Sequence, residues 1–176
     1  MTISFATMAL WIASLLAAAV SDWRSFRIPN ILPGFIIILF LAAQSYSGFT
    51  AAQWGHGFHF LIALSFGMVL FALRWIGGGD AKLYAAIALW FDMKSAVILI
   101  FMTGISGLLL AICYLIVRMF IRRKGPAKST LVKRKQERRI PYGVAISIGA
   151  VLTASFIGWA KLFPGIGPAL GGLPIN

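Results

Sequence analysis

The sequence predicts an all-α membrane protein in which six transmembrane helices, the fourth of them short, form one membrane-embedded domain over residues 1–176. Composition is the first observation behind this prediction. Of the residues, 60% are hydrophobic and 11% charged, whereas soluble domains are about half apolar and about a quarter charged. The second observation is a mean hydropathy of +0.91. The third is that the apolar residues occur in long runs, separated by shorter polar stretches.

Six apolar segments account for the predicted helices, because about 20 residues cross the hydrocarbon of a bilayer as a helix. They cover about residues 3–20, 31–46, 58–76, 81–91, 96–121 and 142–162. The fourth segment would reach only about 16 Å at about 1.5 Å per residue, so it does not cross the bilayer alone unless it is extended or recessed. The glycines at 77–79 before it are expected to be irregular backbone that lines a water-filled cavity at the membrane edge.

The positive charges predict the orientation of the helices. The first basic residue is Arg24, after the first apolar segment, which argues against a signal peptide and favours a membrane helix. Arg27 follows closely, Arg74 and Lys82 flank the glycines, and a basic loop covers about residues 122–139. Cytoplasmic loops carry an excess of Lys and Arg, so these regions are predicted to be cytoplasmic, with the N-terminus and the C-terminus outside.

The net charge of +12 arises from 16 Lys and Arg against 4 Asp and Glu. No nucleic-acid motif accompanies the basic loop, so we expect no nucleic-acid partner. The loop is expected to fix the orientation and to contact anionic lipid of the bilayer, with substrate recognition as the alternative. The single cysteine excludes a paired-cysteine zinc site, and His56 and His59 have no acid or thiol nearby. We therefore predict no metal and no cofactor.

Asp22 and Asp80 are the candidate catalytic residues. Each stands at the end of an apolar run, where an ionisable group is costly and marks a functional site. The predicted topology brings both to the cytoplasmic face. Two neighbouring carboxylates do not both ionise easily, so one keeps a proton while the other activates a water. The helix dipoles favour Asp80 as the base and Asp22 as the acid, although a coupled pair titrates as a unit. A structural alternative makes Asp80 the N-cap of the fourth helix.

Five neighbouring residues are assigned supporting roles. Gly77 and Gly79 admit backbone close to the second carboxylate. Lys82 stabilises that carboxylate, holds substrate, or extends to the membrane surface. Pro29 and Asn30 are expected to turn the chain into the second helix, with Asn30 as its N-cap.

Three motifs together carry a family resemblance. In chain order they are Asp22 followed by Arg27-Ile28-Pro29-Asn30, then Gly77-Gly78-Gly79-Asp80-Ala81-Lys82-Leu83, and finally Ile140-Pro141-Tyr142-Gly143-Val144-Ala145-Ile146. They resemble the type IV prepilin peptidase family of GxGD membrane aspartic proteases. The resemblance implies that Asp22 and Asp80 are the catalytic pair of a multi-pass enzyme of the bacterial cytoplasmic (inner) membrane, with its active site facing the cytoplasm.

The resemblance also implies the substrate. Family members remove a short basic leader from type IV or Flp-type prepilins and pseudopilins, cutting after a glycine just before a hydrophobic helix. Larger members carry an insert with paired Cys-x-x-Cys motifs that is associated with N-methylation of the product. This chain has one cysteine, so it resembles the compact branch that serves Flp-type pili of tight-adherence systems, without methyltransferase activity.

A non-enzymatic interpretation is the alternative. Intramembrane acids also mark ion pathways, so Asp22 and Asp80 would form a proton or cation relay in a small transporter or pilus-assembly subunit. Transport requires a route to both faces of the membrane, whereas hydrolysis requires access from one face. The charged residues cluster on the predicted cytoplasmic face, which favours the peptidase.

Overall fold

The computed structural model describes residues 2–47, 54–122 and 141–163. Within these ranges the chain forms helices joined by turns and contains no strand, which confirms the all-α prediction there. The predicted basic loop, except for Arg122, and the C-terminus lie outside the described residues.

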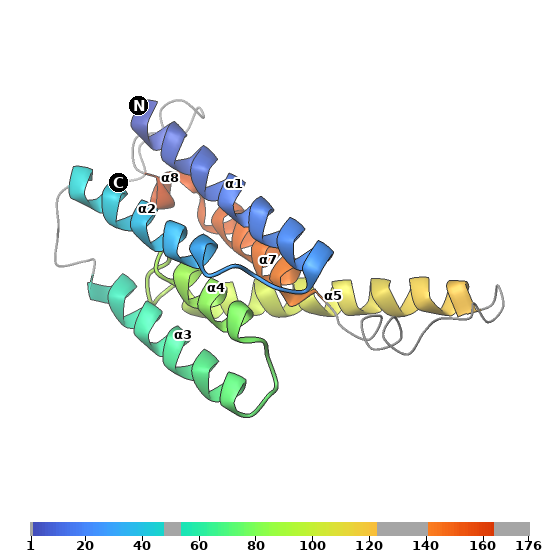
Figure 1. The fold of residues 1–176 in the computed structure, drawn as a ribbon. Helices are drawn as coiled ribbons and strands as arrows, with labels where there is room; N and C mark the ends of the chain where they lie inside the picture. Colours follow the sequence, from blue (N-terminus) through green and yellow to red (C-terminus); the bar gives the residue numbers. More distant parts are fainter. Residues whose placement is uncertain (1, 48–53, 123–140, 164–176) are drawn as a thin grey trace.

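Six longer helices and one of four residues make up the described chain (Figure 1). They are α1 Thr2–Ser25, α2 Ile31–Ser47, α3 Trp54–Ala72, α4 Gly78–Ala88, α5 Ala96–Arg122, α7 Tyr142–Ile157 and α8 Trp159–Leu162. Three spans are long and apolar enough to cross a membrane, namely Ser4–Ser25, Trp54–Ala72 and Ala96–Phe120. Ile31–Ser45 and Tyr142–Ile157 are shorter apolar helices. The protein is therefore a helical membrane protein.

The short helix α4 lies at the centre of the fold. It contacts α2, α3 and α7, while α1 packs on α2 and α7 (Figure 1). Its alanines are buried and allow neighbouring backbones to approach, as in membrane helix packing generally. At Gly67 of α3, an added Cβ would lie 3.1 Å from the Cβ of Ala81. Neighbouring helices thus cover much of α4, while Gly78, Gly79 and Asp80 in its first turn are half-buried.

The backbone before α4 differs from the prediction. Gly77 is extended, with φ −73° and ψ 145°, but Gly78 and Gly79 already belong to the helix. The expectation of irregular backbone through residues 77–79 is wrong for these two glycines, because close packing outweighs the low helix propensity of glycine. The N-cap is Gly77 and Asp80 is the third helical residue, so the alternative that made Asp80 the N-cap is also wrong.

The last apolar segment divides into two helices. It was predicted to be continuous over residues 142–162, but it breaks at Gly158, whose φ of +88° favours glycine. Helix α8 then places Trp159 and Phe163 against Trp11 of α1, with ring centroids 6.2 and 5.9 Å away. This aromatic contact fixes the end of the described chain on α1.

Helix α5 packs on α7. Beyond the start of α7, helix α5 continues away from the bundle (Figure 1). Gly149 allows this contact to be close, because a Cβ there would lie 2.5 Å from the Cα of Thr103. The two helices therefore meet backbone to backbone at this point.

Candidate active site

Asp22 lies in the last turn of α1 and is almost fully buried, with 5% of its surface exposed. Its Oδ2 accepts a hydrogen bond from the Gly143 N–H over 2.6 Å, and a second backbone bond comes from Val144. Both amides belong to the first turn of α7, and the Val144 N–H is shared with the Pro141 carbonyl, which lies 3.3 Å from it. A helix N-terminus favours negative charge, so α7 supports the carboxylate form of Asp22.

Gly143 has no room for a side chain. A Cβ at this position would lie 2.9 Å from Asp22 Oδ2, 3.0 Å from Asp22 Cβ and 2.8 Å from Ile28 Cδ1. The absence of a side chain is what lets the start of α7 approach Asp22 closely enough to donate its amide.

Asp80 is held by the start of its own helix. Its carboxylate accepts a hydrogen bond from the Gly77 amide, as an acid at the third helical position does when it reaches back to the N-cap. A Cβ on Gly77 would lie 2.8 Å from Asp80 Oδ2. Since its φ of −73° suits any residue, Gly77 is required here for space and not for its backbone conformation.

Asp22 and Asp80 interact through their charges, although they belong to different helices. The negative charge of Asp22 acts on Asp80, so ionisation of one carboxyl disfavours ionisation of the other. Their support is unequal, because Asp22 receives backbone bonds from two residues and Asp80 from one. The arrangement suits a pair of carboxyls that shares a single proton.

The other residues with predicted roles lie in the segments that adjoin the pair. Lys82 Nζ donates to Asn30 Oδ1 over 3.2 Å, which joins α4 to the start of α2. Asn30 stands directly before α2, and its carbonyl accepts a bond from the Gly34 N–H over 3.2 Å. The carbonyl of Pro29 accepts from Leu32 N–H over 3.1 Å. Pro29 and Asn30 thus form the turn into α2.

Sequence reasoning missed Ile28 and Gly143 as site residues. Both occur in the motifs that carry the family resemblance, but composition and spacing do not separate them from ordinary packing residues. Ile28 is 9% exposed and lies against both Gly79 and Gly143, which are far apart in the chain. Only the fold brings these three residues together beside the aspartates.

His56 and His59 connect α3 to the end of α4. His56 Nδ1 lies 3.1 Å from the Leu89 carbonyl oxygen, and His59 Nδ1 lies 2.9 Å from the Phe91 carbonyl oxygen. A carbonyl oxygen only accepts, so each Nδ1 carries the proton. Among the described residues, no group of three or more His, Cys, Asp or Glu is arranged to hold a metal ion.

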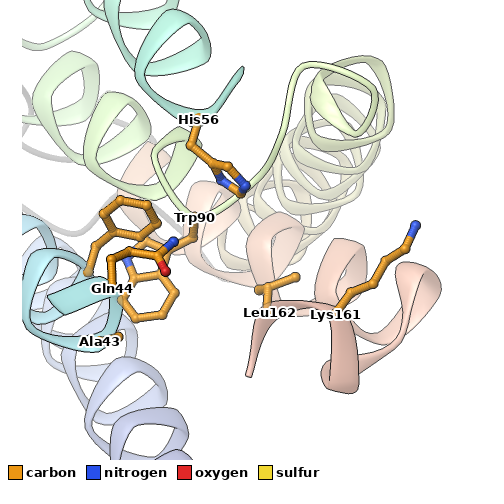
Figure 2. Close-up of a pocket in the computed structure, with 7 residues that line it drawn as sticks. Ala43, Gln44, His56, Trp90, Lys161 and Leu162 are labelled. Carbon is orange, nitrogen blue, oxygen red and sulfur yellow. The ribbon is translucent and has the colours of Figure 1, made fainter. Parts of the chain in front are cut away.

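A cavity of about 90 Å³ lies at the other end of α4. It is lined by Phe40, Ala43, Gln44, His56, Trp90, Lys161 and Leu162 (Figure 2). Ala88, the last residue of α4, is about 12 Å from Asp80 along the axis at about 1.5 Å per residue, and Trp90 follows it in the chain, so this cavity is separate from the aspartates.

The fold and the site define a class of protein, a helical membrane protein with two interacting carboxyls that are each bonded by amides at a helix start. The sequence model of the type IV leader peptidase family matches residues 9–112, more than half of the chain, and the chain belongs to this family. The match includes both aspartates and confirms the resemblance to prepilin peptidases. No curated protein and no solved structure matches the chain.

Proposed function

We propose that the protein is an aspartic endopeptidase that removes the short basic leader from type IV or Flp-type prepilins and pseudopilins. The interaction between Asp22 and Asp80 carries this proposal, because it joins two carboxyls from α1 and α4 that have different hydrogen-bond donors. Two acids that share one proton provide both the base and the acid that peptide hydrolysis requires. Family membership favours this activity over a transporter or assembly subunit.

In the proposed reaction Asp22 is the base, because two amides of α7 support its ionised form, and Asp80 carries the shared proton. Asp22 takes a proton from water as the water oxygen attacks the scissile carbonyl carbon. Asp80 gives its proton to the carbonyl oxygen, which forms a tetrahedral diol. The carbon–nitrogen bond then breaks as Asp22 passes its proton to the leaving nitrogen and one diol proton returns to Asp80.

These roles are the reverse of those that the dipoles of α1 and α4 favoured. That prediction considered the negative end of α1 at Asp22 and the positive end of α4 at Asp80. The positive end of α7 also faces Asp22, and it supplies hydrogen bonds in addition to a dipole. Direct bonds from two amides outweigh the more distant end of the helix that carries the aspartate.

The active site is proposed to face the cytoplasm from the bacterial inner membrane, in a topology of six spans with both termini outside. Arg24 and Arg27 follow Asp22, and Arg74 and Lys82 flank the motif of Asp80. A concentration of positive charge beside both aspartates supports this orientation. The basic loop is proposed to contact anionic lipid, and the single cysteine supports a peptidase without N-methyltransferase activity.

The test is co-expression with a Flp-type prepilin, with leader removal followed as a change of size on a gel. Asp22→Asn and Asp80→Asn are each expected to lower the rate by about 1000-fold or more, since an amide neither takes nor gives the proton. Asp92→Asn is the matched control, because Asp92 lies in the turn after α4 at the far end from Asp80.

Three outcomes are informative. Loss of cleavage in the two site variants, with normal membrane levels and an active Asp92→Asn control, supports the pair. Cleavage at the wild-type rate by either site variant refutes it. Failure of the wild type to cut any prepilin, including type IV prepilins, contradicts the proposed substrate.

A further inference from the structure

Ile28 belongs to the turn between α1 and α2, residues 26–30, which passes beside both aspartates. We propose that Ile28 is a positioning residue whose side chain sets the separation of Asp22 and Asp80. The inference rests on the proposed function and adds to it a residue outside the catalytic pair.

The first support is the contact between Ile28 and the start of α4. A Cβ at Gly79 would lie 3.1 Å from Ile28 Cβ, 3.4 Å from its carbonyl oxygen and 3.5 Å from its nitrogen. Both the side chain and the backbone of Ile28 therefore lie against the residue that directly precedes Asp80. Any displacement of Ile28 toward α4 is transmitted to Asp80.

The second support is the contact between Ile28 and the start of α7. A Cβ at Gly143 would lie 2.8 Å from Ile28 Cδ1, on the same residue whose amide donates to Asp22. The side chain of Ile28 thus extends from the glycine beside Asp80 to the glycine that bonds Asp22. Because close-packed groups transmit small changes of volume, the length of this side chain fixes how closely the two helix starts approach.

The third support is that the turn itself is anchored on both sides of Ile28. The hydroxyls of Ser21 and Ser25 donate to the Arg27 carbonyl over 2.9 and 3.2 Å. Phe26 adopts φ +50°, an uncommon conformation for a residue other than glycine, which surrounding contacts must maintain. Asn30 accepts the bond from Lys82 on the other side. Ile28 is therefore presented from a fixed backbone.

The separation of the aspartates determines the pH range of activity. Repulsion between two charges falls with distance. When the two carboxyls are farther apart, the pair therefore holds a single proton over a narrower range of pH. A shorter side chain at position 28 lets α4 and α7 shift and changes this range. A residue that merely stabilises the fold would alter the amount of enzyme and leave the pH profile in place.

The first experiment measures leader removal by the full chain in membranes as a function of pH and prepilin concentration. Ile28→Ala is expected to lower kcat at least about tenfold, with a smaller effect on KM, and to change the width of the bell-shaped pH profile. Ile31→Ala is the matched control, because Ile31 is 76% exposed. A wild-type kcat and pH profile for Ile28→Ala would overturn the proposal.

The second experiment needs no large cavity and remains available if Ile28→Ala fails to fold. Gly143→Ala places a Cβ against Ile28 Cδ1 and Asp22, and it is expected to lower cleavage about 100-fold. Valine lacks the Cδ1 atom, so Ile28→Val in that background is expected to restore cleavage by at least about fivefold. The remaining contact with Asp22 prevents full recovery.

If Ile28 only stabilised the fold, removal of its Cδ1 atom in the Gly143→Ala variant would not be expected to raise activity. Absence of any gain, with Ile28→Val alone active, would contradict the proposed role. Asp22→Asn and Asp80→Asn decide the proposed function separately. If both lose cleavage while the Ile28 variants behave as wild type, the positioning role fails and the aspartic mechanism stands.

Discussion

Lys82 Nζ lies 3.2 Å from Asn30 Oδ1, and this bond joins α4 to α2 beside the aspartate pair. Both side chains are exposed. A hydrogen bond of this kind contributes about 0.5–1.5 kcal/mol, so we expect Lys82→Met to slow leader removal by about two- to tenfold. Asn30→Ala should give the same reduction, and the double variant little more, since both changes remove one bond. Complete loss in Lys82→Met at normal enzyme levels would instead indicate direct contact with substrate.

Gly77→Ala tests the space beside the second aspartate. The new Cβ would lie 2.8 Å from Asp80 Oδ2, so the carboxyl must move, while the φ of −73° accommodates alanine. We expect a fall in cleavage of about 100-fold at matched membrane levels, because displacement of a reacting group by about 1 Å has effects of this size. Gly34→Ala in α2 is the control, since no atom lies within 4 Å of a Cβ there. Wild-type cleavage by Gly77→Ala would show that catalysis does not require this position of the Asp80 carboxyl.

Asp92 stabilises the turn before α5. Its Oδ1 accepts from the Ser95 N–H over 3.0 Å and from the Ser95 hydroxyl over 2.6 Å. Burial alone would raise the pKa of Asp92, but these bonds, with His56 and Lys161 nearby, hold the pKa below its ordinary value of 3.8. The ionised carboxyl therefore stabilises the fold above its ordinary pKa, and this contribution is lost as the pH falls through the lowered value.

We accordingly expect Asp92→Ala to lower the free energy of unfolding by about 1 kcal/mol at neutral pH, as loss of a capping residue does. Thermal unfolding of the purified protein in detergent measures the difference. This difference in the free energy of unfolding should shrink in acid, where the wild-type carboxyl is protonated and loses its charge. A deficit that is the same at neutral and acidic pH would show that the charge of Asp92 is not its source.

Gly149→Ala tests the contact between α5 and α7. The added Cβ would lie 2.5 Å from Thr103 Cα, which is backbone and cannot rotate away. Overpacking of this kind destabilises by about 1–3 kcal/mol, so we expect a lower Tm. Gly104→Ala on α5 is the matched control, because no atom lies within 4 Å of a Cβ there. An unchanged Tm for Gly149→Ala would mean that the two helices separate without cost.

The sequence singles out the two aspartates as a candidate pair, because the cost of an ionisable group beside an apolar run depends on local composition. Helix ends were less predictable. The predicted third helix began at residue 58, whereas α3 begins at Trp54 and includes His56. His56 bonds the Leu89 carbonyl after α4, a contact between residues far apart in the chain, and hydropathy carries no sign of it.

The donors to Asp22 could not be predicted from the sequence for a related reason. The 140–146 motif was visible as a family feature, but the bond from Gly143 to Asp22 depends on how α7 packs against α1. The helix break at Gly158 could not be predicted either, because a glycine in an apolar run is compatible with a close helix contact and with a helix end. Its φ of +88° decides between them.

The two ends of α4 are held differently, and this has a mechanical consequence. Just after the end of α4 that is remote from Asp80, His59 bonds the Phe91 carbonyl and the Trp90 indole donates to the Ile36 carbonyl over 3.2 Å, so α3 and α2 hold the chain there. Asp80 lies near the opposite end of α4, which is about 16 Å long. A tilt of the helix by about 4° therefore displaces that end by about 1 Å. A small rotation of α4 about the end that His59 and Trp90 hold would therefore change the distance between the Asp22 and Asp80 carboxyls.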